Sequence, residues 1–470
     1  MPRAPKNGRR PNLDSVTTIN ADGSHNVLHP ADVRGRFTTA RRWVALALMI
    51  VYAALPWIPI NGAPAVFFDV ETRHFHVFGI TLVAQDLWVL FFGISGLGFV
   101  LFVITSVLGR IWCGWACPYT VFLDHVFRRI ERWIDGDATA RRKLAAAPLD
   151  LSKVTKRFSK HALYLLASAL IAHVFLSYFV SIPRLYSFMK EGPLQHATSF
   201  GIVASLTGAL YFCFAQFREQ FCVLMCPYGR LQSALTDEDT MIIGYDSKRG
   251  EPRGKATDLT AGSCVDCLRC VNVCPTGIDI RSGLQLECIG CAACIDACDD
   301  IMLKLKRPTG LIRYDSSRGL AGEKRRIFRP RLVAYGILGA LGMTALGVTA
   351  FYRAKPMNAD VTRMRGPSFF VDPTVIRNHF QLRTVNKRNQ PITFSVSLEN
   401  APDGYNITGQ TEGLTLRAMQ ETARPIVVMV PKDSYQGPAT LTVKIHAQPG
   451  NSTIRREVEF LGPNPNLVRR

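Results

Sequence analysis

Eight cysteines between residues 264 and 298 have a spacing that suits iron–sulfur chemistry. They form two runs of C-x2-C-x2-C-x3-C, and the first run ends in Cys274-Pro275. In bacterial two-cluster ferredoxins, three thiolates of such a run hold one cluster and the fourth cysteine reaches the other. The first 4Fe-4S cluster is therefore predicted to take Cys264, Cys267, Cys270 and Cys298. The second is predicted to take Cys274, Cys288, Cys291 and Cys294.

Structural zinc and disulfide bonds are the alternatives for these eight thiols. Zinc sites use pairs of C-x2-C rather than two runs of four. Disulfides need an oxidising compartment, whereas the charges between the apolar stretches place this segment in the cytoplasm. The second run ends in Cys298-Asp299 instead of Cys-Pro. Because proline shapes a turn and is not a ligand, we expect a changed local geometry and an intact cluster.

A second cysteine pattern occurs twice, 109 residues apart. Cys113 and Cys117 stand in C-x3-C-P-Y, and so do Cys222 and Cys226. Residues four apart share a helix face, and the following proline favours a break and a new helix start. A helix N-terminus lowers the pKa of a thiol. The two pairs are therefore predicted to converge in a metal or redox site of four thiolates, a ligand set that suits Cu(I), zinc or iron.

Cys213 and the histidines carry weaker signals. Cys213 lies inside an apolar stretch and is expected to serve only apolar packing. Apolar packing is also the alternative to a metal or redox role for the four thiols of the C-x3-C-P-Y motifs. His161 and His173 lack the matching second pair that a haem between facing helices requires. His74 and His76 alternate in a loop, as an external copper contact would need.

Five apolar stretches must position these motifs. The chain has 470 residues, of which 48% are hydrophobic, and a membrane span needs about 20 residues. The second and fourth stretches each end just before a C-x3-C-P-Y motif, so the first four form two duplicated helical hairpins. The predicted spans are residues 43–60, 87–109, 161–180, 200–217 and 332–352.

The positive charges between the spans alternate. The five segments before and between the spans carry 8, 1, 11, 2 and 18 Lys and Arg residues. Basic segments stay in the cytoplasm. The N-terminus and the cluster cysteines are therefore predicted to be cytoplasmic, and the C-terminal segment periplasmic, in a bacterial inner membrane. The net charge of +20 is thus an orientation signal, and no nucleic-acid partner is expected because no binding motif occurs.

The C-terminal segment has a different pattern. Runs such as Ile392–Leu398 and Leu441–His446 alternate apolar and polar residues, with turn residues between them. Several short strands at this spacing predict an antiparallel, all-β, immunoglobulin-like sandwich. No nucleophile–base pair stands out there, so we expect a binding module.

The predicted fold is a multi-domain membrane protein with five transmembrane helices. Its first 42 residues are polar and are expected to be disordered. The predicted parts are a disordered cytoplasmic tail (1–42), duplicated transmembrane hairpins with C-x3-C-P motifs (43–235), a cytoplasmic ferredoxin-like two-cluster domain (236–331), a fifth transmembrane helix (332–352) and a periplasmic β-sandwich (353–470).

This combination resembles the membrane polyferredoxins that serve as accessory proteins of cbb3-type cytochrome c oxidase, the FixG/CcoG-like proteins. The likeness covers about residues 40–470 and rests on both cysteine patterns together. It implies an oxidoreductase that reduces Cu(II) to Cu(I) for assembly of that oxidase. The implied cofactors are two 4Fe-4S clusters and copper. The implied partners are the lipid bilayer, a cytoplasmic electron donor, and oxidase subunits or copper chaperones. The family's membrane motifs match Cys113, Cys117, Cys222 and Cys226, and which of these thiols touches copper stays open.

Two other functions fit the same residues. A membrane electron relay would exchange electrons between the clusters and a quinone. A non-catalytic assembly scaffold would use the clusters structurally and hold the oxidase through the β domain. Direct NAD(P)H oxidation is not expected, because no GxGxxG fingerprint occurs.

Overall fold

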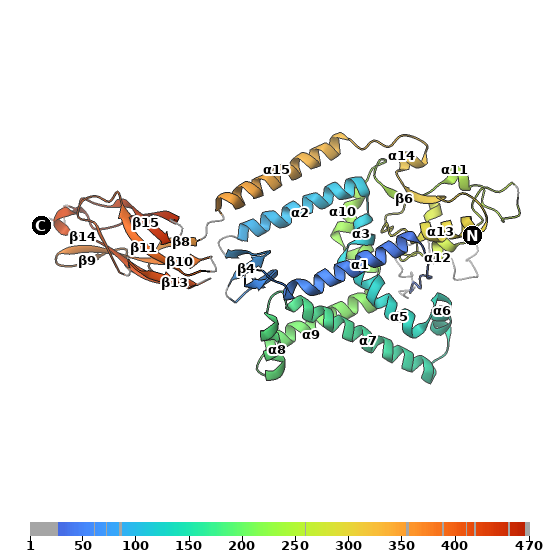
Figure 1. Cartoon of the computed structure of the whole chain (residues 1–470), viewed down its shortest axis with the longest axis horizontal. Coiled ribbons are helices and arrows are strands. Elements are labelled where there is room, and N and C mark those ends of the chain that lie inside the picture. Colours follow the sequence, from blue (N-terminus) through green and yellow to red (C-terminus); the bar gives the residue numbers. More distant parts are fainter. Residues whose placement is uncertain are drawn as a thin grey trace. The chain divides into compact units, whose positions relative to one another are not determined.

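The computed structural model describes residues 27–465, apart from residues 61, 72, 84–86, 259, 354–356, 388–389, 410, 418–419 and 450–451. The chain forms two compact units, Met1–Leu346 and Gly347–Arg470. The first is mainly helical, and the second is built of strands (Figure 1).

Five helices among the described residues are long and apolar enough to cross a membrane, which confirms the predicted number. At most 22% of any span is buried inside the chain. Helices that are apolar around most of their surface are expected to face lipid. The five helices are α1 (Arg36–Ala54), α2 (Leu87–Leu108), α7 (Leu151–Leu176), α9 (Ala197–Tyr211) and α15 (Pro330–Arg353).

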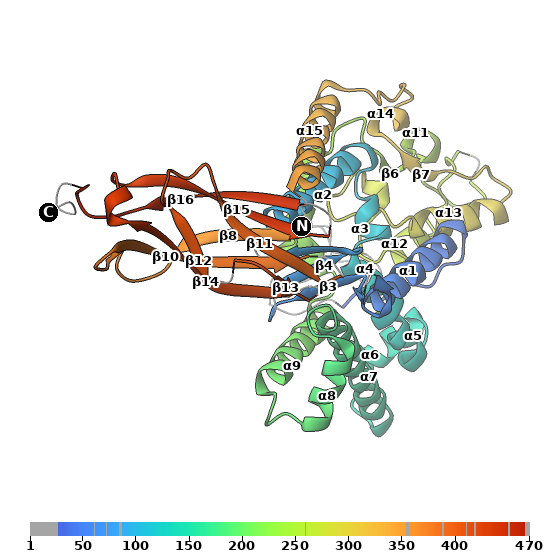
Figure 2. The ribbon, with the colours of Figure 1, turned by 60° about the vertical axis from the view of Figure 1, so that its left-hand side comes forward.

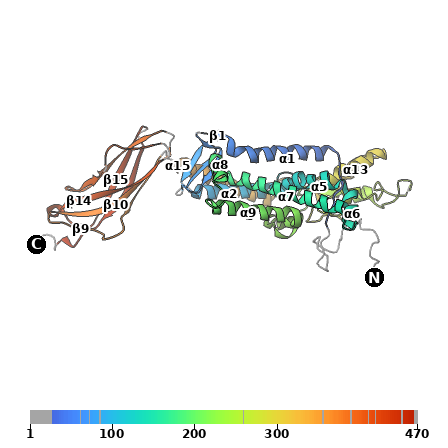
Figure 3. The ribbon, with the colours of Figure 1, turned by 90° about the horizontal axis from the view of Figure 1, so that it is seen from below.

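The span helices pack in pairs. α7 and α9 lie side by side (Figure 3). α15 lies along α2, where the sulfur of Met343 fills the space beside Gly96. Two spans begin earlier than predicted, because basic residues extend α1 and α7 at their N-termini. Asp150 caps α7 by accepting hydrogen bonds from the backbone N–H groups of Ser152 and Lys153.

The connection between α1 and α2 contains strands rather than only a loop. β3 (Val66–Asp69), β4 (His74–Val77) and β5 (Ile80–Val83) form an antiparallel sheet. The His76 ring contacts the Thr81 hydroxyl at 2.9 Å. Two further strands of this connection, β1 (Pro59–Ile60) and β2 (Ala63–Pro64), pair with each other. The connection between α7 and α9 contains helix α8 (Ile182–Glu191).

Short helical elements carry both C-x3-C-P-Y motifs. Cys117 and Cys226 are extended, with ψ of 123° and 110°, and each precedes a proline that starts a helix. The predicted break at both motifs is therefore present. The elements after α2 are α3 (Ile111–Trp115), α4 (Pro118–Phe122), the π-helix η3 (Leu123–Phe127), α5 (Arg128–Asp135) and α6 (Ala138–Ala146). Those after α9 are the π-helices η4 (Phe212–Phe217) and η5 (Phe221–Met225), then α10 (Pro227–Leu235).

The cluster segment lies between two paired strands, β6 (Ile242–Tyr245) and β7 (Ile312–Asp315). Its two cysteine runs share a backbone conformation. The residue after the second cysteine of each run has positive φ, 56° at Leu268 and 62° at Ala292, and a helix follows at once. The helices of this segment are α11 (Ser247–Gly250), α12 (Arg269–Asn272), η6 (Ile280–Ser282), α13 (Ala293–Lys304) and α14 (Ser317–Leu320).

The two runs differ at their fourth cysteines. α12 ends at Asn272, before Cys274-Pro275, whereas α13 continues through Cys298 to Lys304. Proline disfavours a helical conformation of the preceding residue, and aspartate does not. The geometry at the second run is therefore changed, as expected from Cys298-Asp299.

Part of the predicted disordered tail is ordered. Residues 1–26 lie outside the described residues. Val33 is buried among the cluster cysteines, and the backbone N–H of Ala31 donates to the carbonyl of Asn272 at 2.7 Å. The expectation of disorder up to residue 42 is thus wrong for this stretch, because contacts with the distant cluster segment fix it.

The start of α1 is fixed by the same segment. The Asp296 carboxylate of α13 accepts hydrogen bonds from the backbone N–H groups of Phe37 at 3.2 Å and Thr38 at 2.7 Å. A carboxylate at a helix N-terminus satisfies free N–H groups and complements the helix dipole. The first span therefore begins on the cluster segment.

The second unit is an antiparallel β-sandwich, which confirms the predicted C-terminal fold (Figure 2). One sheet has the order β12-β14-β10-β8, with β9 beside β10, and the other has the order β13-β11-β15-β16. Alternate residues of β11, such as Phe394, point into the core. The strands are β8 (Met357–Arg363), β9 (Phe370–Val371), β10 (Val375–Asn386), β11 (Ile392–Glu399), β12 (Asn406–Gly409), β13 (Leu414–Leu416), β14 (Glu421–Pro431), β15 (Ala439–Gln448) and β16 (Ser452–Phe460).

Candidate functional site

The first predicted group of cluster cysteines comes together in the fold. Burial, together with the nearby Cys298 and Cys267, raises the pKa of the Cys270 thiol to about 12. Cys298 in turn lies near Cys264 and Cys267. Cys267 is exposed, whereas Cys264 and Cys270 are buried. The first group therefore reaches the surface of the cluster segment.

The second predicted group of cluster cysteines is more buried than the first. Burial raises the pKa of the Cys288 thiol to about 12, with Cys291 and Cys274 close by. Burial also raises the pKa of Cys294, which lies near the other three and near Cys270 of the first group. The two predicted groups are thus neighbours in the fold, and the assignment of each thiol to one cluster stays a prediction.

The eight cysteines give the number of thiols that two 4Fe-4S clusters need, four for each cluster. Within the described part of the chain, no three His, Cys, Asp or Glu side chains are arranged to hold one metal ion. This holds for the cluster cysteines and for the four thiols of the duplicated motif alike, so a single ion at either place would require the side chains to move closer together.

The four thiols of the duplicated motif also converge. Cys222 lies near Cys117, Cys113 and Cys226. The Gln232 side-chain amide of α10 donates to the Cys113 sulfur at 3.3 Å. The structure therefore brings together the pairs that the repeat predicted, and Gln232 is a neighbour that the sequence pattern did not indicate.

The predicted lowering of thiol pKa is wrong for two of these cysteines. Burial raises the pKa of Cys113 to about 11 and also raises the pKa of Cys222. Both residues lie in the helices that precede the breaks, so the new helix N-termini do not act on them directly. Burial outweighs the helix effect there, and a bound metal would have to displace the proton.

The first motif touches the second cluster group directly. A Cβ on Gly114 would lie 2.6 Å from the carbonyl oxygen of Ile289 and 2.9 Å from the backbone N of Cys291. Only glycine allows so close an approach. The neighbouring Cys113 side chain packs against the buried core that contains the cluster cysteines. The thiol site and the second cluster group are therefore in van der Waals contact through backbone.

Hydrogen bonds from three side chains hold this contact. Arg41 of α1 donates from Nε to the Gly114 carbonyl at 2.7 Å. Trp115 donates from Nε1 to the Tyr314 hydroxyl at 3.1 Å, and that hydroxyl donates to the Gly290 carbonyl at 2.6 Å. The motif is thus fixed on both sides of Gly114, by residues that no spacing pattern indicated.

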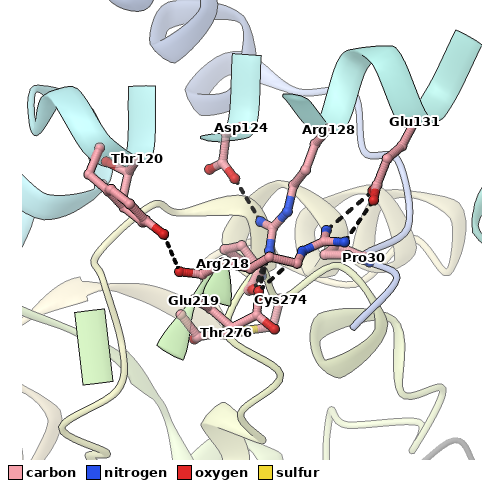
Figure 4. Close-up of polar contacts among 12 residues, drawn as sticks. Pro30, Thr120, Asp124, Arg128, Glu131, Arg218, Glu219, Cys274 and Thr276 are labelled. Carbon is pink, nitrogen blue, oxygen red and sulfur yellow. Dashed lines mark hydrogen bonds and ion pairs between the residues drawn. The ribbon is translucent and has the colours of Figure 1, made fainter. Parts of the chain in front are cut away.

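A buried ionic network continues the junction (Figure 4). Asp124 pairs with Arg128 at 2.6 Å and with Arg41 at 2.8 Å. Arg128 also pairs with Glu219 at 3.2 Å and donates to the carbonyl of Pro275, which follows the cluster cysteine Cys274, at 2.8 Å. Arg128 therefore links both cysteine-motif regions to the cluster segment.

The second half of the network centres on Glu131. It pairs with Arg218 at 2.7 Å and with Arg141 at 3.4 Å. Burial favours the neutral carboxyl group, but the Arg218 charge outweighs this effect and lowers the pKa of Glu131 to about 2. Asp124 behaves alike, because Arg128 and Arg41 outweigh burial and lower its pKa to about 2. These carboxylates stay charged in the interior.

Comparisons with known protein families match this architecture. Residues 217–317 match a family described as a 4Fe-4S dicluster domain, and residues 89–136 match a 4Fe-4S binding domain. Residues 347–463 match the IG-like fold at the C-terminus of FixG. The fold and these matches define a membrane-associated 4Fe-4S electron-transfer protein with an immunoglobulin-like C-terminal domain.

Relatives over most of the chain identify the family. Protein RdxA of Cereibacter sphaeroides is 36% identical over 397 residues, covering 80% of this chain and 82% of the relative. The nitrogen fixation protein FixG of Rhizobium meliloti is 35% identical over 460 residues, covering 86% of each chain. Protein RdxB of Cereibacter sphaeroides is 34% identical, covering 92% of this chain and 90% of the relative. The chain belongs to the FixG/RdxA family of bacterial membrane proteins.

Proposed function

We propose that the protein reduces Cu(II) to Cu(I) for assembly of a cbb3-type cytochrome c oxidase. The observation that carries this proposal is the contact between Gly114 and the Ile289–Cys291 loop. It joins a site of four convergent thiols to the second cluster group without an intervening side chain. Thiolates are soft ligands that prefer Cu(I), so the site suits the product of the reduction.

The burial of the cysteines gives the route a direction. Cys267 of the first group is exposed to solvent, and Cys291 of the second group is buried against the first membrane motif. When bound, the two clusters supply single electrons at a low potential. A cytoplasmic donor would meet the protein at the first group, and each electron that leaves beside Cys291 would reduce one Cu(II) at the thiols.

The proposed orientation places the N-terminus and the cluster segment in the cytoplasm and the sandwich in the periplasm. The positive charges between the spans support it. In this orientation the immunoglobulin-like unit would bind an oxidase subunit or a copper chaperone. Cys113, Cys117, Cys222 and Cys226 would hold the copper, and the eight cluster cysteines would hold two 4Fe-4S clusters in the predicted grouping.

The decisive experiment follows two absorbances at once. Anaerobic protein is reduced, freed of excess reductant, and mixed with Cu(II) and a chromophoric Cu(I) chelator. The clusters should reoxidise as the Cu(I) complex forms. The variant Cys113→Ser/Cys117→Ser should keep its cluster absorbance and lose Cu(I) formation, whereas Cys213→Ser, a membrane cysteine outside the site, should behave as wild type. Equal Cu(I) formation by all three proteins would contradict the proposal.

A second variant tests the backbone contact without removing a thiol. Gly114→Ala should separate the motif from the Ile289–Cys291 loop, because the added methyl group meets backbone atoms that cannot rotate away. The rate of cluster reoxidation by Cu(II) should fall at least tenfold. Gly98→Ala in α2 is the matched control, since nothing lies within 4 Å of a Cβ there. An unchanged rate for Gly114→Ala would exclude this contact as the route.

Two hollows beside the membrane helices give a quinone relay less support than the thiol site gives copper reduction. The hollow beside Cys288, at the end of α2, measures about 30 Å³, which is the volume of about one water molecule. A larger apolar hollow of about 710 Å³ is lined by the C-terminal part of α7 and the N-terminal part of α9. It lies at the opposite end of α9 from the Cys222 motif, so a quinone there would be remote from the thiols.

A further inference from the structure

A basic hollow lies between α1, α5, α6 and the cluster segment. It measures about 110 Å³, and Pro275 and Ala293, each next to a cysteine of the second cluster group, form part of its wall. Two aspartates line it, Asp32 and Asp124. Six arginines line it as well: Arg41, Arg42, Arg128, Arg129, Arg132 and Arg141.

The positive charge of the hollow is only partly balanced. Four of the six arginines have carboxylate partners: Asp124 is shared by Arg41 and Arg128, Asp32 pairs with Arg132 at 2.8 Å, and Glu219 and Glu131 pair with Arg128 and Arg141. Arg42 and Arg129 have no ion pair with any described residue. Burial and the neighbouring Arg42 charge lower the pKa of Arg129, which shows that like charges are crowded there. A bound anion would relieve this repulsion.

The arginines also have unused hydrogen-bonding capacity. The Nε atoms of Arg128 and Arg141 have no hydrogen-bond partner among the described residues, but they are buried and closed to a ligand. The guanidinium groups without an ion pair, those of Arg42 and Arg129, are therefore the ones that an anion in the hollow would bind. The planar guanidinium group matches the geometry of phosphate oxygens and binds them in pairs. A hollow of this size, with several guanidinium groups in its wall, has room for one phosphate group and not for a folded partner.

Exposed tryptophans place the hollow at the level of the lipid headgroups. Trp43 follows Arg42 on α1 and is 68% exposed, and Trp133 follows Arg132 on α5 and is 76% exposed. Tryptophan is enriched at membrane–water interfaces. Clusters of basic residues just cytoplasmic of a transmembrane helix bind anionic headgroups. Two of the three helices around the hollow, α1 and α5, carry an exposed tryptophan next to a lining arginine.

We propose that this hollow binds the phosphate group of an anionic phospholipid. The headgroup sits between the first span and the Cys274-Pro275 turn, and its charge completes the arginine cluster. The bound lipid fixes the cluster segment against the membrane surface, next to the wall that Pro275 and Ala293 form. The site is separate from the thiols and does not depend on copper reduction.

The test measures lipid retention by the full-length protein. Protein purified in neutral detergent is incubated with mixtures of phosphatidylglycerol and phosphatidylcholine, and bound lipid is counted by native mass spectrometry. Wild type should retain phosphatidylglycerol in preference to phosphatidylcholine. Arg42→Gln/Arg129→Gln should bind phosphatidylglycerol at least tenfold more weakly. The control Lys255→Gln/Lys324→Gln removes the same charge at exposed sites of the cluster segment and should bind as wild type. Cluster absorbance reports whether each variant is folded.

Competition with inorganic phosphate distinguishes binding of a phospholipid from binding of any free anion. Added phosphate should displace phosphatidylglycerol only at concentrations far above those of the lipid, because it lacks the acyl chains that hold the headgroup at the interface. Equal affinity for inorganic phosphate and lipid would overturn the assignment to a phospholipid. Equal retention by wild type and the arginine variant would overturn the site itself.

Discussion

The junction between the membrane helices and the cluster segment has a charged interior, whereas the sandwich has an apolar one. Glu131, Arg218 and Arg141 are at most 4% exposed, and the Glu131 carboxylate pairs with both arginines. In the sandwich, the fully buried side chains are mostly apolar, such as Phe394 and Ile445, and an ion pair such as Glu399–Arg455 lies on the exposed surface. The two regions therefore use opposite means of packing.

The difference follows from what each region has to fix. Apolar side chains hold two sheets together without requiring one exact partner for each residue. Buried ion pairs cost desolvation free energy and contribute little net stability, but they tolerate only a few arrangements. At the junction, the backbone at Gly114 lies so close to Ile289 and Cys291 that there is no room for a side chain between them. A directional network suits this task better than an apolar interface.

The largest expected effect is on the charged interior. Glu131→Ala would leave Arg218 and Arg141 without their shared carboxylate inside the protein. Removing one partner of a buried pair costs about 3–5 kcal/mol, because the other charge stays buried and uncompensated. All six tryptophans precede residue 134, so their fluorescence reports the unfolding of the first unit alone. We expect a clear fall in its thermal midpoint with no change in the transition of the sandwich.

A small effect of Glu131→Ala would contradict the comparison. In that case water would reach Arg218 and Arg141, and removing a charge partner at the junction would cost no more stability than removing one at the protein surface. Glu131→Gln separates charge from size, since it keeps the volume and one hydrogen-bond acceptor. It should retain part of the lost stability.

The strands of the sandwich and the cysteine motifs could be predicted from the sequence, whereas the contacts of the junction could not. Alternation in Ile392–Leu398 predicted the strand β11, because a sheet with one buried face repeats every two residues. The prolines after Cys117 and Cys226 predicted the same break twice, because proline acts on the residue before it. The eight cluster cysteines were predicted in groups for the same reason, since their spacing is local.

The junction could not be predicted in this way. Asp296 caps a helix 258 residues away, and Gly114 meets Cys291 across the fold. Gly114 and Asp296 lie inside the two cysteine patterns, but the spacing of those patterns does not indicate which distant residue each one contacts. The buried pairs were equally hidden, because Arg128 and Arg218 also belong to the basic segments that set the membrane orientation. Their role at the junction depends on tertiary structure alone.

The second largest effect should come from acid. The pKa of Asp124 is lowered to about 2 in the folded protein, against about 3.9 for a free side chain. Its stabilising effect is therefore complete above about pH 4 and is lost as the pH falls through 2, at a cost of roughly 2–3 kcal/mol. Tryptophan fluorescence from pH 6 down to about pH 2 should show a steeper loss of stability for wild type than for Asp124→Asn. Parallel curves would mean that folding does not lower the pKa of Asp124.

A smaller effect is expected inside the sandwich. Ile445 is fully buried between the sheets, and Ile445→Val removes one methylene group. Such a change costs about 1 kcal/mol, because the neighbours only partly fill the space. Calorimetry of the full chain should show a lower transition for the sandwich and an unchanged one for the unit that carries the clusters. A shift of the cluster unit as well would mean that the two units unfold together.

The smallest effect should come from the ion pair on the sandwich surface. Glu399 on β11 pairs with Arg455 and Lys444, which is the same kind of contact that Glu131 makes with two basic residues at the junction. Water screens the exposed pair and solvates either partner when the other is removed. Glu399→Ala should therefore leave the transition of the sandwich unchanged, although it deletes the same carboxylate as Glu131→Ala. If both variants lowered the midpoint of their units equally, burial would not be the cause, and the contrast between the two interiors would fail.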